Sequence, residues 1–259
     1  METVKRMRAC LATVALSSLV VGSVHAAEPP DDSASVDAGP MRIYFIGNSH
    51  TARNGGLDWH IENLAASEET PRTVEGSSET ASGATLQYHY SNGATSRIRT
   101  GQYDVVVLQG HLPGSLTRSS APFLEYSRRF DEVIRETGAR TVFFMSWPQG
   151  RYGNWAGLDD IVAAHRQVES ELDADVAPVA LAMERARAER PDLELIGEDT
   201  IHATWAGAYL SAVVVYATLF DRSPEGLPYH FGISDEDADF LQRIAWQEVL
   251  DWRAGSPSG

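Results

Sequence analysis

Cysteine is almost absent from this 259-residue sequence, because Cys10 is the only one. It lies at the start of an apolar run that ends near Val24, whereas the lipid-bearing cysteine of a lipoprotein would be expected at the end of such a run. We therefore expect no lipid anchor. If the chain is cut after Ala26, no thiol remains, which excludes disulfides, zinc–thiolate sites and a cysteine nucleophile from the rest of the chain.

The apolar run itself predicts an export signal. Lys5, Arg6 and Arg8 precede it, and the segment 24–26 places small residues at the −3 and −1 sites of a cleavage point after Ala26. We expect a signal peptide at residues 1–26, a disordered leader at 27–39 and one folded domain at 40–254, in a periplasmic or secreted protein. No other stretch has the length and apolar character of a membrane span, so we expect no stable membrane anchor.

Positive charge is also scarce. Lys5 is the only lysine, and 21 basic residues stand against 36 acidic ones, which gives a formal net charge of −15. Such a surface repels nucleic acid and anionic membranes. The composition therefore excludes nucleic acid as an expected partner and leaves the oligomeric state open.

Several common site motifs are missing as well. The sequence has no G-x-x-x-x-G-K-[ST], no G-x-G-x-x-G after a strand and no H-E-x-x-H, which removes support for nucleotide and zincin sites. It also lacks the G-x-S-x-G elbow of α/β-hydrolases. We expect the protein to need neither a cofactor nor a metal.

What the chain does contain is an alternation of β-type runs and helical patterns. Buried strands are expected at 43–46, 72–75, 103–108, 141–145 and 193–196, and helices at about 54–68, 91–100, 121–138, 158–172, 178–190, 204–220 and 234–252. This alternation predicts a parallel sheet with right-handed crossovers and helices on both faces. The expected fold class is α/β, a three-layer α/β/α flavodoxin-like domain with a five-stranded parallel sheet.

One serine stands directly between the first strand and the first helix, in the turn Gly47-Asn48-Ser49-His50-Thr51. Such a serine can simply cap the helix. It can also be a nucleophile, because open α/β sheets bind ligands in the crevice at the carboxyl ends of their strands. The turn by itself does not decide between these interpretations.

A candidate base for Ser49 lies late in the chain. His202 follows the last expected strand, and Asp199 precedes it by three residues in "GEDTIHATWAG". A serine hydroxyl needs a base within hydrogen-bond reach, and an imidazole base needs a carboxylate that fixes its tautomer. The simpler interpretation is that Asp199 caps the helix that follows.

Acyl transfer further requires donors for the oxyanion. The backbone N–H of Ser49 is one candidate, and Gly83, in a loop of small residues after the second strand, is another. Gln109 ends "YDVVVLQG", so its side-chain amide could be a third. The alternatives are a plain turn glycine and a polar residue that covers the strand end.

In this order the blocks resemble those of the SGNH hydrolases, also called GDSL-type esterases. "IGNSHT" is similar to the first block, with Asn48 where aspartate is usual, and Gly83 is similar to the glycine block. "DTIH" is similar to the last block. In the third block Gln109 stands where asparagine is usual, as in a branch of the superfamily with glutamine at this place.

This resemblance spans residues 41–220 and implies an SGNH fold and ester hydrolysis. It implies that Ser49 is the nucleophile, His202 the base and Asp199 the acid. It also implies an oxyanion hole made of Ser49, Gly83 and Gln109.

The substrate is less defined. Trp147, Tyr152 and Trp155 follow the fourth strand in "SWPQGRYGNWAG", where sugar rings or acyl chains could pack, although ordinary loop packing is the simpler explanation. The complete set of expected substrate-binding residues is Asn48, His50, His111, Trp147, Tyr152 and Trp155. Export and the acidic composition favour small acyl esters such as O-acetylated carbohydrate, so we expect a small-molecule or carbohydrate ester as the partner.

Two other functions stay open. Asn48 and Gln109 depart from the usual blocks, which would suit an inactive exported binding protein with the same fold. A lysophospholipase or thioesterase is equally compatible with the three catalytic candidates. If the side chains of Ser49 and His202 lay well beyond hydrogen-bond reach, the esterase hypothesis would fail.

Overall fold

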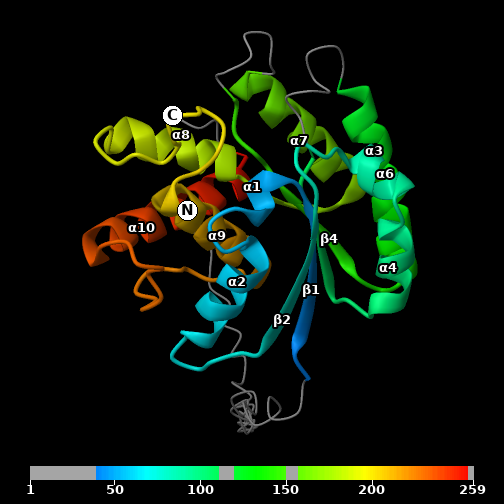
Figure 1. Cartoon of the computed structure of the whole chain (residues 1–259), viewed down its shortest axis with the longest axis horizontal. Helices are drawn as coiled ribbons and strands as arrows, with labels where there is room; N and C mark the ends of the chain where they lie inside the picture. The colour runs from blue at the N-terminus through cyan, green and yellow to red at the C-terminus, as the bar shows by residue number, and fades with distance from the viewer. Residues whose placement is uncertain (1–38, 111–119, 150–156, 256–259) are drawn as a thin grey trace, which may run out of the picture. The chain divides into compact units, whose positions relative to one another are not determined.

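The computed structural model describes residues 39–110, 120–149 and 157–255 (Figure 1). The expected signal peptide and all but the last residue of the expected leader lie outside these ranges, as do His111, Tyr152 and Trp155. The expectations for those residues therefore stay predictions.

In the described part, five parallel strands form one sheet with the order β2-β1-β3-β4-β5. The strands are β1 (Met41–Gly47), β2 (Val74–Thr80), β3 (Val105–Leu108), β4 (Arg140–Phe144) and β5 (Asp175–Ala177). Phe45 in β1 lies opposite Ser78 of β2 and Val107 of β3, which fixes the register. This arrangement confirms the expected five-stranded, flavodoxin-like α/β fold, whose switch point for ligands lies between β1 and β3.

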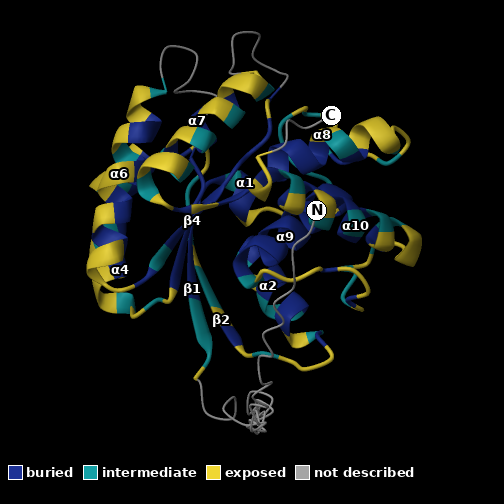
Figure 2. Ribbon diagram, turned by 180° about the vertical axis from the view of Figure 1, so that it is seen from behind, coloured by how far each residue is buried: buried dark blue, intermediate teal, exposed yellow. Residues whose placement is uncertain are grey.

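Helices cover both faces of the sheet (Figure 1). One layer contains α2 (Leu57–Ala66), α8 (Val179–Glu189), α9 (Trp205–Phe220) and α10 (Asp235–Arg253), and the other contains α3 (Leu86–Ser91), α4 (Ala94–Gly101), α6 (Ala121–Glu136) and α7 (Leu158–Leu172). The short α1 (Ser49–Ala52) follows directly on β1. Helix α9 is buried almost all round (Figure 2), which explains its apolar composition.

None of the helices in the described ranges combines the length and the apolar character that a membrane span requires.

The expected strand at 193–196 is wrong, and β5 lies earlier, at Asp175–Ala177. The segment "LELI" instead folds back on the chain that follows it. The N–H of Thr204 donates to the carbonyl of Leu195 at 3.0 Å, and Ile196 forms an isolated antiparallel bridge with Ala203. Its β-forming residues thus close a loop rather than extend the sheet.

Two short helices that the sequence analysis did not expect, α1 and α3, precede the helices expected at about 54–68 and 91–100. Between α1 and α2, Asn54, Gly55 and Gly56 all have positive φ angles, of 53°, 101° and 81°. Gly93, with φ 92°, separates α3 from α4 in the same way. A helix cannot continue through the left-handed region, so α1 and α3 each end before the expected helix begins.

His165 of α7 gives the core a predicted acid sensitivity. The side chain is fully buried, and burial lowers its pKa to about 4, although the carbonyl of Ile161 accepts a hydrogen bond from Nδ1 at 2.8 Å. The unfolded chain, with an ordinary histidine pKa, therefore takes up this proton at a higher pH than the folded chain. As the pH falls from about 6.5 to about 4, this residue alone should remove up to about 3 kcal/mol from the free energy of unfolding.

Urea unfolding at several pH values in this range would test the expectation. The His165→Leu variant should lose less stability than the wild type between pH 6.5 and pH 4. Parallel curves for the two proteins would contradict it.

Candidate active site

The turn after β1 is built around Asn48. This residue caps α1, since its Oδ1 accepts the N–H of His50 at 3.0 Å. Its Nδ2 donates to the carbonyl of Ala84 at 3.3 Å, which ties the turn to the loop after β2. Ser49 is therefore held, half-buried, at the first position of α1 and at the switch point of the sheet.

Gln109, the residue after β3, supports this turn from below. Its Oε1 accepts two hydrogen bonds, from the N–H of Asn48 at 2.9 Å and from Oγ1 of Thr51 at 3.0 Å. Its Nε2 donates to the carbonyl of Gly110 at 3.1 Å. Gln109 thus braces the turn that carries Ser49.

Gly47 is required here by close approach. A Cβ at this position would lie 2.2 Å from Oγ1 of Thr51 and 2.8 Å from Oε1 of Gln109. Any side chain at position 47 would have to displace one of these buried groups. The glycine therefore allows β1, α1 and Gln109 to meet.

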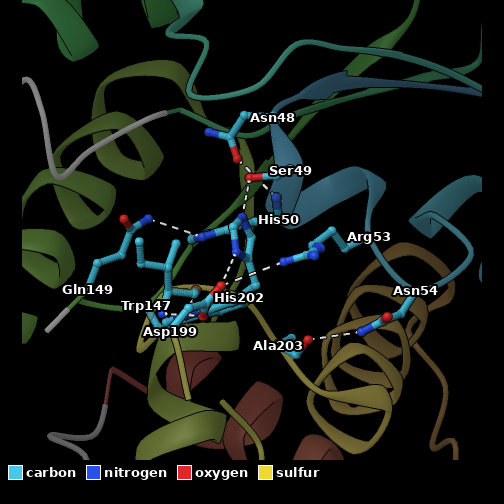
Figure 3. Close-up of polar contacts among 11 residues, drawn as sticks. Asn48, Ser49, His50, Arg53, Asn54, Trp147, Gln149, Asp199, His202 and Ala203 are labelled. Atoms are coloured by element: carbon cyan, nitrogen blue, oxygen red, sulfur yellow. Dashed lines mark hydrogen bonds and ion pairs between the residues drawn. The ribbon is translucent and has the colours of Figure 1, made fainter. Parts of the chain in front are cut away.

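The side chains of Ser49, His202 and Asp199, here called the triad, form a chain of hydrogen bonds (Figure 3). Nδ1 of His202 lies 2.6 Å from Oδ2 of Asp199, and Nε2 lies 2.9 Å from Oγ of Ser49. An ionised carboxylate can only accept, so Nδ1 carries the proton in the neutral ring. Nε2 is then free to accept the hydroxyl proton of Ser49.

Asp199 also organises the loop that holds it. Its Oδ1 accepts the backbone N–H groups of Ile201 at 3.0 Å and of His202 at 2.9 Å. Hydrogen bonds hold the pKa of Asp199 well below its ordinary range. The largest effect comes from the backbone N–H of His202, followed by the imidazole of His202 and the backbone N–H of Ile201. The carboxylate therefore stays ionised at neutral pH.

Two neighbours position the loop of Asp199 and His202 from outside. The indole N–H of Trp147 donates to the carbonyl of Ile201 at 3.0 Å, and its ring stacks on His50 with centroids 4.3 Å apart. His50 in turn contacts Oγ of Ser146 and lies 3.0 Å, through Nε2, from Nε2 of Gln149. Trp147 and His50 are both buried, and Trp147 holds this loop through its hydrogen bond to Ile201. The expected contact of Trp147 and His50 with a substrate stays a prediction.

Gly83 lies where the turn and the loop after β2 meet. It is exposed, has φ 65°, and precedes the residue whose carbonyl binds Asn48. Among the described residues, neither its N–H nor that of Ser49 has a hydrogen-bond partner in the fold. Both groups are thus available to an incoming acceptor.

No family model matches the chain, and neither does any curated protein. Solved structures do resemble it. A proposed SGNH hydrolase from Slackia heliotrinireducens is 25% identical with a TM-score of 0.59, over 70% of this chain and 100% of its own. The chain has the SGNH hydrolase fold.

Two further neighbours share this SGNH fold at lower identity. A DUF4886 family protein from Bacteroides uniformis is 15% identical with a TM-score of 0.64, over 85% of this chain and 98% of its own. An acetylxylan esterase from Geobacillus stearothermophilus is 13% identical with a TM-score of 0.53, over 77% of this chain and 100% of its own. Hydrolases of esters are thus found among the proteins with this fold.

The SGNH fold of this chain brings together residues that the sequence analysis did not single out. Arg53 lies 3.7 Å from Asp199, in a half-exposed ion pair that is weak at the surface. Nε2 of His89, which is buried, lies 2.8 Å from the carbonyl of Gly47. Arg53 comes four residues after Ser49, one helical turn away, and this spacing could have indicated it.

A cleft of about 900 Å³ adjoins the candidate site. Its lining includes Trp147, Thr200, and Met183 of α8, but none of the three triad residues. Within the described ranges, no group of three His, Cys, Asp or Glu side chains could hold a metal ion.

Replacing Gln109 should weaken the turn. In Gln109→Met the buried N–H of Asn48 and hydroxyl of Thr51 lose their acceptor, which costs about 1–3 kcal/mol for each donor left unpaired. We expect urea unfolding to report this loss and any esterase activity to fall with it. Gln247→Met, at an exposed position of α10, should leave stability nearly unchanged. Equal stability of both variants would contradict the bracing role of Gln109.

Proposed function

We propose that the protein is an exported serine esterase. The acyl group of the substrate is transferred to Ser49, and water then releases it as the carboxylic acid. The observation that carries the proposal is the pair of short contacts of His202, 2.9 Å to Ser49 and 2.6 Å to Asp199. A nucleophile, a base and an orienting carboxylate in this relation are what acyl transfer requires. The inactive-protein alternative offers no chemical reason for it.

In the first half of the reaction, Oγ of Ser49 attacks the carbonyl carbon while its proton passes to Nε2 of His202. The bond between that carbon and the alcohol oxygen then breaks, and the same proton leaves with the alcohol. In the second half, His202 takes a proton from water as the water oxygen attacks the acyl–Ser49 ester. The bond between the acyl carbon and Oγ of Ser49 then breaks, the proton on Nε2 of His202 passes to Oγ, and the carboxylic acid departs. Asp199 stabilises the imidazolium in both halves.

The developing oxyanion needs donors that no group of the protein already occupies. The backbone N–H groups of Ser49 and Gly83 meet this condition among the described residues. We propose them as the oxyanion hole. We propose Gln109 as the third donor. Its Oε1 is engaged in the turn, so it can donate only through the Nε2 proton that is not hydrogen-bonded to the carbonyl of Gly110.

We propose a small acyl group, such as acetyl on carbohydrate, as the substrate. The acidic composition disfavours anionic lipid surfaces. An acetylxylan esterase among the structural neighbours has the same fold.

Covalent labelling tests this proposal directly. The protein should react with a fluorophosphonate probe, and digestion with mass spectrometry should locate the adduct on Ser49. It should also hydrolyse p-nitrophenyl acetate faster than p-nitrophenyl octanoate. Labelling at another residue, or no labelling and no hydrolysis, would refute the proposal, while a preference for octanoate would refute the small acyl group.

A further inference from the structure

Two large apolar side chains are exposed close to the triad. Trp59 is 43% exposed and Trp205 is 55% exposed. Trp59 lies in the first turn of α2, and Trp205 is the first residue of α9. These two helices pack against each other (Figure 1), and α2 follows closely in the chain on α1, which begins at Ser49.

Phe231 joins the two indoles into one surface, here called the aromatic ledge (Trp59, Trp205 and Phe231). Its ring centroid lies 5.1 Å from that of Trp59 and 4.8 Å from that of Trp205. Gly55 lies directly against the ledge, since a Cβ there would come within 3.0 Å of Trp59 and 3.3 Å of Phe231. The ledge is therefore ordered by packing while its outer side stays in water.

The aromatic ledge is continuous with the site. Trp205 follows His202 by three residues, so their Cα atoms lie at most about 11 Å apart. Nδ2 of Asn54, next to Gly55, donates to the carbonyl of Ala203 at 2.9 Å, which ties the nucleophile side to the loop of His202 (Figure 3). The residues that follow Ser49 and His202 in the chain therefore both lead to the ledge.

The packing of the ledge indicates what it binds. A cage for a quaternary ammonium group needs space between its rings, but these rings fill that space by contacting one another. The net charge of −15 disfavours a phosphate headgroup. Flat ring faces carry negative partial charge and suit the C–H faces of sugar rings. Asp235 is exposed and is held at 2.9 Å by His230 beside Phe231, so its carboxylate can accept hydrogen bonds from sugar hydroxyls.

We propose that the aromatic ledge binds pyranose rings of the carbohydrate whose ester is cleaved at Ser49. The inference rests on the proposed function, because it assigns the ledge to the alcohol part of the ester. The ledge makes the protein an esterase of oligosaccharides rather than of single sugars or lipids.

Calorimetric titration of the full protein with unesterified hexaoses of xylose, glucose, mannose and N-acetylglucosamine tests the ledge without any turnover. At least one hexaose should bind, and Trp59→Ala and Trp205→Ala should each raise its Kd by about 2- to 12-fold. Trp205→Phe should keep most of the affinity. Leu250→Ala, which removes a similarly exposed apolar side chain from α10, should leave the Kd unchanged.

Phosphocholine is titrated into the same protein for comparison. The proposal is overturned if no hexaose binds, if the tryptophan variants bind hexaose as well as the wild type does, or if phosphocholine is the only ligand that binds. Hydrolysis of p-nitrophenyl acetate by the same wild-type sample reports on the proposed function separately. Sugar binding that depends on the tryptophans in a protein without esterase activity would support the ledge and refute only the hydrolysis.

Discussion

Ser49→Ala should lower kcat/KM for p-nitrophenyl acetate by about 10⁴-fold or more. In the proposed mechanism this variant loses the atom that forms the acyl intermediate, and water must then react without covalent catalysis. Because the hydrogen bond that Oγ of Ser49 forms within the described part is the one to His202, the fold should lose little with it. Hydrolysis rates and urea unfolding, measured on the same sample, separate the two effects.

Ser96→Ala is the matched control, because Ser96 is an exposed serine in α4, away from the sheet edge of the triad. It should retain full activity. Equal hydrolysis by wild type and Ser49→Ala would mean that Ser49 is not the nucleophile and would favour the binding-protein alternative.

Asp199→Asn should lower kcat by about 10³–10⁴-fold at neutral pH with little loss of stability. The asparagine keeps an oxygen for the N–H groups of Ile201 and His202, so the loop can stay closed. Its amide, however, turns a donor toward Nδ1 of His202, which favours the tautomer with the proton on Nε2. That tautomer cannot accept the proton of Ser49.

Asp199→Ala distinguishes the chemical role from the structural one. This variant also removes the oxygen that caps the loop, so it should lose stability as well as activity. If Asp199→Asn were as active as the wild type, the carboxylate would serve only the loop. Thermal unfolding and kcat for both variants provide the comparison.

The sequence predicted the sheet well where apolar β-type residues are concentrated. β1, β3 and β4 are buried runs of such residues, and their positions agree with the expectation. β5 is only three residues long and carries a weak signal, whereas "LELI" carries a stronger one. Tertiary pairing overrode local propensity there, because Leu195 bonds to Thr204 in the loop.

The candidate site was predictable to the extent that its residues follow strand ends. Ser49 and Gln109 come directly after β1 and β3, and parallel strands bring their carboxyl ends together. The bracing role of Gln109 was not predictable, because it depends on which amide atom faces Asn48. The ledge was missed for a similar reason, since Trp59, Trp205 and Phe231 are distant in the sequence and meet only in the fold.

The loop that closes on itself at Leu195 and Thr204 has a consequence for folding. Asp199 and His202 belong to one short segment, so their contact can form locally, early in the search of the chain for its native state. The contact between His202 and Ser49 spans 153 residues and requires the two ends of the domain to dock. The rate at which hydrolysis recovers during refolding should therefore report when the two ends of the domain have docked, and not when the secondary structure has formed.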